Sequence, residues 1–187
     1  MPGFSGIGYS GYQSGLAYQF RGAISENLEH LQMAYLFDDV LCSHAGIGME
    51  WLERSFGKPN DESEHNWNVD TLEGVKGVVE LINEYFKHKP GIFEFCGFNP
   101  YGDSTNQTPI WIRPASLMKV NKGTKLKENV IQVVGHTQVK NIFESVLTTK
   151  KTMGGRYYLN DAIESNGYLV VEDGSFSPKE IEKVLPS

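Results

Sequence analysis

The stretch NVIQVVGHTQV, residues 129–139, reads as a short apolar strand that runs directly into a glycine, a histidine and a threonine. The apolar run over residues 130–134 predicts the strand itself. Glycine has no side chain to block an approach, so a Gly-His pair at a strand end can direct the imidazole of His136 into a cleft. A second histidine, His44, follows a strand predicted over residues 39–42 in the same way. Open α/β sheets place their ligand sites at the carboxyl ends of strands, so both histidines are candidate site residues.

Hydrophobic spacing, capping residues and turn signals predict the other elements. Apolar residues at helical spacing predict a helix over residues 70–87, with Asp70 as its N-cap and Glu73 completing a capping box. The remaining predictions are a loop over residues 1–22, a short helix from Ser25, antiparallel strands over 155–162 and 166–174 joined through 164–167, and a closing helix from the capping box at 177–180 to Leu185. Helix-like and strand-like segments therefore alternate, which indicates a mixed α/β fold.

The length and net charge of the chain limit the classes of protein to which it can belong. The 187 residues suit one domain, and the net charge of −6 argues against nucleic acid or an anionic membrane as the main partner. No apolar run is long enough to span a bilayer and the first residues lack a signal peptide, so a cytoplasmic location is expected. Cys42 and Cys96 have no metal-type spacing and are expected to be buried free thiols.

The histidines allow two interpretations. Either of His44 and His136 alone can be a structural residue satisfied by hydrogen bonds, and two histidines do not complete a metal site. Together, at matching strand ends, they could equally be metal ligands. The other three, His30, His65 and His88, are expected on the solvated surface.

Four motifs together resemble a known superfamily. They are LCSHAGIGMEWLE at 41–53, TPIWIRP at 108–114, QVVGHTQV at 132–139 and YYLNDAIESNGYLVVEDG at 157–174. Their order is similar to that in the second half of calcineurin-like metallophosphoesterases, closest to the serine/threonine phosphatases and symmetrical diadenosine-tetraphosphate hydrolases. This resemblance implies an α/β fold that is part of a four-layer calcineurin-like β-sandwich flanked by helices. Residues 1–187 would then be one incomplete domain with the N-terminal half missing.

The resemblance also implies roles for particular residues. His44 and His136 would be ligands of one divalent metal (Mn, Fe, Zn or Ni), and Arg113 would bind the phosphate group. Gln138 stands where other branches of the superfamily carry a second histidine.

Three motifs of the superfamily are absent from the chain: Asp-x-His, Gly-Asp-x-x-Asp-Arg-Gly and Gly-Asn-His-Asp/Glu. The implied function is therefore that of a C-terminal fragment of a metal-dependent phosphoesterase, which hydrolyses phosphate esters or anhydrides with a metal-bound hydroxide. Without the first metal site, this chain alone is expected to be inactive and to bind metal weakly or not at all. The alternative is a non-catalytic phosphoesterase-like scaffold that binds a partner or a phosphorylated ligand.

The expected partners follow from the same resemblance. They are a phosphorylated substrate and either a second copy of the chain, in a homo-oligomer, or the missing N-terminal half. Loss of that half would expose an apolar sheet face and open strand edges, which favour association.

Overall fold

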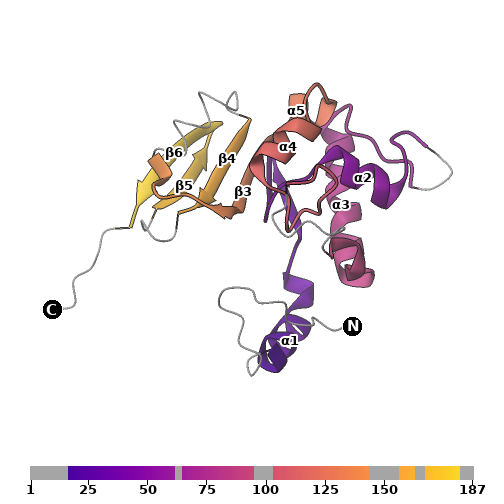
Figure 1. Cartoon of the computed structure of the whole chain (residues 1–187), viewed down its shortest axis with the longest axis horizontal. Coiled ribbons are helices and arrows are strands. Elements are labelled where there is room, and N and C mark those ends of the chain that lie inside the picture. Colours follow the sequence, from indigo (N-terminus) through magenta and orange to yellow (C-terminus); the bar gives the residue numbers. More distant parts are fainter. Residues whose placement is uncertain (1–16, 62–64, 95–102, 144–155, 163–166, 182–187) are drawn as a thin grey trace.

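The computed structural model describes residues 17–61, 65–94, 103–143, 156–162 and 167–181, which form a mixed α/β arrangement (Figure 1). The helices are α1 (Ala17–Glu26), α2 (Met49–Phe56), α3 (Leu72–His88), α4 (Pro114–Val120) and α5 (Lys125–Asn129), with 3-10 turns η2 (Leu28–His30) and η3 (Pro90–Phe93). The strands are β1 (Ala34–Phe37), β2 (Val40–Ser43), β3 (Ile131–Gln138), β4 (Tyr157–Asp161), β5 (Gly167–Glu172) and β6 (Ser175–Glu180). No described helix is both long enough and apolar enough to cross a membrane.

Strands β1 to β4 form one sheet in the order β1-β2-β3-β4. The pair β1–β2 is antiparallel, whereas β3 lies parallel to both β2 and β4. Parallel neighbours end at the same edge of a sheet, so the carboxyl ends of β2 and β3 lie side by side. This pairing places the two strand ends that carry the candidate histidines next to each other.

One face of this sheet is covered by helices. Leu41, Gln132 and Tyr157 lie in register across β2, β3 and β4 and are all buried. The core that covers Leu41 includes the buried residues of α2 and α3. They are Trp51, Leu52, Phe56, Val75, Val78, Val79 and Ile82. A smaller cluster around Val134 and Tyr157 includes Leu117 of α4. The helices therefore fix the sheet from the side on which Gln132 lies.

The opposite face is covered at one end by a hairpin. Tyr35, Cys42, Val133 and Tyr158 form a row in register across the four strands. The ring of Phe176, from the β5–β6 hairpin, stacks on Tyr158 with 4.1 Å between centroids. At the other end of the row Tyr35 is 55% exposed. Association through this face, expected from the sequence, stays a prediction.

The first helix and the long helix differ in detail from the predictions. Ser25 lies inside α1 rather than at the start of a helix, and the expected helix after it is replaced by the short turn η2. Residues 17–22, expected as loop, are helical, while 1–16 lie outside the described residues. In α3 the N-cap is Thr71, whose hydroxyl accepts a hydrogen bond from Gly74 N, so the assignment of Asp70 was wrong by one residue.

The predictions for the C-terminal part of the chain were wrong about which strands pair and about the closing helix. Strand β4 does not pair with β5 but lies parallel to β3, and β5 pairs with β6 instead. Residues 177–180, expected as the capping box that begins a helix, lie instead in β6. The reason is the turn at Asp173 and Gly174, both with positive φ, because such a turn joins two antiparallel strands. The Asp-Gly turn signal outweighed the capping pattern that follows it.

The mixed α/β class is confirmed, and the part of the chain that the structure describes gives no support to a four-layer calcineurin-like sandwich. The described residues contain a four-stranded sheet with helices and a separate two-stranded sheet, and no second large sheet faces the first among them. Cys42 is a half-buried free thiol, whereas Cys96 lies outside the described residues.

Candidate functional site

The two candidate histidines meet at the sheet edge. His44 Nε2 lies 3.1 Å from His136 Nδ1, and the rings are inclined by 62° with 5.0 Å between centroids. His44 directly follows β2, and His136 lies near the end of β3. The backbone locks the two segments together, since Gly135 N donates a hydrogen bond of 2.8 Å to His44 O. The structure thus brings together two of the three site residues expected from the sequence.

The backbone of His136 is unusual. Its φ is +45°, in the left-handed region that residues with a side chain adopt rarely. The register explains this conformation: Val134 pairs with Leu159 and Gln138 with Asp161, so residues 135–137 form a bulge opposite a single residue of β4. Bulges re-aim side chains, and strained backbone is concentrated at functional sites. The bulge is therefore what turns the His136 ring towards His44.

Arg113 is the third expected residue, and it lies beside the histidine pair. It occupies the N-cap position of α4, and its Nη1 donates a hydrogen bond of 3.4 Å to Thr137 Oγ1. The indole ring of Trp111 lies 5.3 Å from the His136 ring. One cationic side chain and two imidazoles from three segments of the chain therefore gather at one edge of the sheet.

Both imidazoles are held neutral. Burial lowers the pKa of His136 to about 4, helped by His44 and by the positive charge of Arg113, while Asp161 and the Trp111 backbone oppose the shift. Burial also lowers the pKa of His44, again opposed by Asp161. Near pH 7 the pair therefore offers nitrogen lone pairs rather than positive charge.

This geometry fits two ligands of a single divalent ion. Two nitrogens, each about 2.1 Å from a shared ion at an angle of about 90–110°, lie roughly 3.0–3.4 Å apart. The observed nitrogen separation of 3.1 Å falls in that range, and it also fits a hydrogen bond between the rings of the metal-free chain. Within the described ranges, no group of three or more His, Cys, Asp or Glu side chains could hold a metal. The pair is therefore at most a partial protein shell, open to oxygen atoms of a ligand or of water.

Sequence reasoning missed three residues of this site. Thr137 binds Arg113, Trp111 packs against His136, and Asp161 acts on both imidazoles by its charge. Thr137 and Trp111 lie in motifs that carry His136 and Arg113, so their neighbourhood was a usable signal. Asp161 had no such signal, because only the pairing of β3 with β4 brings it close.

The remaining histidines lie elsewhere. His30, His65 and His88 are exposed, as expected. His65 is nevertheless partnered, since its Nε2 lies 2.8 Å from the hydroxyl oxygen of Tyr85. Gln138, at the position discussed for a second histidine, is exposed at the end of β3.

Comparison with known proteins gives one informative similarity. A nucleoside triphosphate pyrophosphatase of Prochlorococcus marinus (strain AS9601) is 29% identical over 148 residues, which cover 78% of this chain and 70% of that protein. No family model matches the chain. No solved structure matches it either.

These findings correct the family and the function expected from the sequence. The resemblance to calcineurin-like metallophosphoesterases was wrong, since the similarity found is to a nucleoside triphosphate pyrophosphatase. The calcineurin-type phosphoesterase activity and its non-catalytic alternative depended on that resemblance and were wrong with it. The physical reason is that a histidine beside small residues at the end of a strand suits a site at the edge of many different sheets. Short Gly-His and Ser-His segments therefore do not identify one superfamily.

Proposed function

We propose that the chain binds a nucleoside triphosphate at the site of His44, Arg113 and His136 and hydrolyses it to a nucleoside monophosphate and pyrophosphate. Water attacks the α-phosphorus, the bond from the α-phosphorus to the oxygen that bridges to the β-phosphate breaks, and pyrophosphate leaves. The similarity to a nucleoside triphosphate pyrophosphatase supports the substrate class. The observation that carries the proposal is the imidazole pair, with 3.1 Å between its nitrogens, beside a guanidinium group.

Arg113 has the chemistry to hold the triphosphate. A guanidinium group donates several hydrogen bonds in one plane and binds phosphate oxygens in a bidentate manner. Thr137 supports it from one side with its hydroxyl group. The chain has a net charge of −6, so a local cation is needed to offset repulsion between the protein and a polyanionic ligand.

A separate proposal concerns a divalent cation. His44 Nε2 and His136 Nδ1 would hold a Mn, Fe, Zn or Ni ion. The separation of 3.1 Å between the two nitrogens supports this, and the lowered pKa of each ring agrees with it. When bound, the ion would offset negative charge on the phosphate chain. The binding role belongs to the two imidazoles, and Arg113 contacts phosphate oxygens.

The hydrolysis proposal is tested by product analysis. The purified chain is incubated with ATP, GTP, CTP or UTP, with and without Mn²⁺, and phosphorus NMR identifies the products. We expect pyrophosphate and the monophosphate, with p-nitrophenyl phosphate left intact. Arg113→Ala and His136→Ala should reduce turnover at least tenfold, whereas His65→Ala, a change at an exposed histidine away from the pair, should not. Absence of turnover with all four nucleotides, or equal loss in the His65 variant, would overturn the proposal.

The cation proposal has its own readout. Isothermal titration of the chain with Zn²⁺ should show one site per chain that is lost in both His44→Ala and His136→Ala. Unchanged binding in either variant would show that the ion sits elsewhere.

A further inference from the structure

Gln132 is a polar residue in an apolar row. It lies on the helix-covered face of the sheet between Leu41 and Tyr157 and is 1% exposed. An amide buried in this way costs free energy unless both its oxygen and its nitrogen find hydrogen-bond partners. An aliphatic side chain would fill the same position in the row without that cost.

Both polar atoms of Gln132 bind the backbone of one residue. Its Oε1 accepts a hydrogen bond of 2.8 Å from Ile47 N, and its Nε2 donates one of 3.1 Å to Ile47 O. Ile47 is three positions beyond His44, in the segment of residues 44–48 that joins β2 to α2. The side chain of Gln132 therefore ties strand β3 to the segment that begins with His44.

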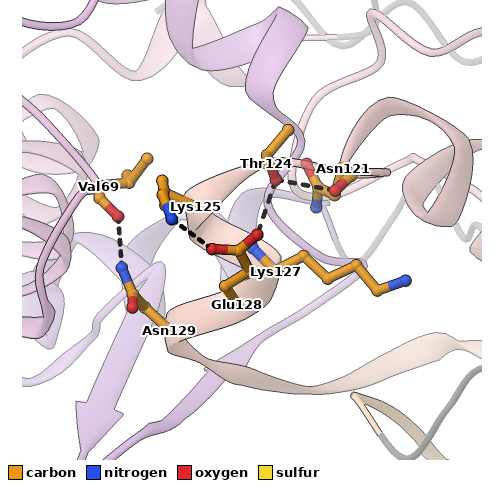
Figure 2. A network of polar contacts seen from close by, with 7 residues as sticks. All are labelled: Val69, Asn121, Thr124, Lys125, Lys127, Glu128 and Asn129. Atoms are coloured by element: carbon orange, nitrogen blue, oxygen red, sulfur yellow. Dashed lines mark hydrogen bonds and ion pairs between the residues drawn. The ribbon is translucent and has the colours of Figure 1, made fainter.

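Asn121 binds the same segment from another direction. Its Nδ2 donates a hydrogen bond of 2.8 Å to Ile47 O, and its Oδ1 accepts one of 3.1 Å from Met49 N. Asn121 is 0% exposed and lies just after α4. Its own backbone is fixed, because its carbonyl accepts a 2.8 Å hydrogen bond from Thr124 Oγ1 at the start of α5 (Figure 2).

We infer that Gln132 and Asn121 are positioning residues that hold segment 44–48 so that His44 reaches His136. Strand β3 then supplies both parts of the arrangement: it carries His136 at its end and, four residues earlier, the amide that fixes the segment after His44. The functional role of these two residues rests on the proposed nucleotide site. The arrangement itself consists of hydrogen bonds within the chain and is tested without activity.

The test compares two amide variants by NMR. Gln132→Met removes the amide at similar volume and leaves Ile47 N without its partner. Asn83→Leu is the matched control, because the Asn83 amide also binds backbone, at Met33 and Ala34, but at the β1 edge of the sheet rather than at the histidine pair. Long-range proton–nitrogen spectra of the imidazoles at pH 7 report the hydrogen bond between His44 and His136. We expect its loss in Gln132→Met and unchanged imidazole signals in Asn83→Leu, although both variants should melt at lower temperature.

A second readout uses Zn²⁺ alone. Loss of a group that orients a ligand typically lowers metal affinity about 10–100-fold, which we expect for Gln132→Met and not for Asn83→Leu. If Gln132→Met does not fold, Asn121→Asp replaces it, since the carboxylate still accepts from Met49 N but repels Ile47 O. Imidazole signals that are unchanged in the folded variant, or disturbed equally in Asn83→Leu, would overturn the inference. Failure of nucleotide hydrolysis alone would overturn the proposed function and leave this result intact.

Discussion

His44 Nε2 and His136 Nδ1 are 3.1 Å apart in space although 92 positions separate the two residues in the chain. The contact requires the parallel pairing of β2 with β3, and all of α2, α3, α4 and α5 lie in the connection between those strands. The imidazole pair therefore forms only when β2 and β3 lie side by side. A measurement on the pair is thus a measurement on the native arrangement of the sheet.

Acid should destabilise the metal-free chain through this pair. The pKa of His136 is lowered from 6.5 to about 4 in the folded chain, so between these values the unfolded chain binds more protons. The free energy of unfolding should accordingly fall as the pH is lowered from about 6.5 towards 4. Urea denaturation at pH 7 and pH 5, with NMR titration of the ring, measures both quantities. His136→Asn should flatten the dependence, and a His136 ring that titrates near 6.5 would contradict the burial argument.

Arg113→Ala should change the site in two ways. The positive charge of Arg113 lowers the pKa of His136, so its removal should raise that pKa. The proposed nucleotide site also loses its charged donor, and affinity should fall about tenfold or more. Arg113→Lys keeps the charge without the planar pair of donors, so it should retain most of the pKa effect and only part of the affinity. A titration of His136 that is identical in all three proteins would place the guanidinium away from the ring.

The start of α3 offers a test of the corrected N-cap. The hydroxyl of Thr71 accepts from Gly74 N at 3.1 Å, whereas the Asp70 carboxylate is outside the helix and accepts from the Asn60 side chain. Thr71→Ala should therefore cost about 1 kcal/mol of stability, and Asp70→Ala clearly less. Thermal and urea denaturation of the two variants shows whether Thr71 or Asp70 is the N-cap. A larger loss for Asp70→Ala would restore the assignment made from the sequence.

Much of the site's location could be predicted from the sequence, and its geometry could not. The strand ends at His44 and His136 are visible because each apolar run stops at a histidine flanked by small residues. Their contact depends on which strands are neighbours, and the aim of His136 depends on a bulge set by the register of β4. Register is a long-range property, so a single-strand pattern carries no information on it.

The wrong predictions have a common physical origin. Ser177 to Glu180 satisfy a local capping rule, yet the turn at Asp173 and Gly174 returns the chain as β6. The superfamily resemblance likewise rested on short local motifs. Gln132 shows the reverse case: a glutamine inside the apolar run of residues 130–134 was a signal of buried hydrogen bonding that the strand prediction ignored.

Gly46 should be the glycine of the site that tolerates substitution least. Its φ is +113°, and a Cβ atom there would lie 2.3 Å from Leu117 Cδ2, which belongs to a side chain that is 1% exposed and packed in a core cluster. Gly123 is a matched control, because its φ of +73° is also positive but nothing lies within 4 Å of its Cβ position. Gly123→Ala should then cost only backbone strain, about 1 kcal/mol, whereas Gly46→Ala should cost roughly 2–4 kcal/mol by adding a steric clash in the core. Urea denaturation of both variants measures the difference. Equal losses would mean that the segment after His44 is not pressed against α4 as the structure has it.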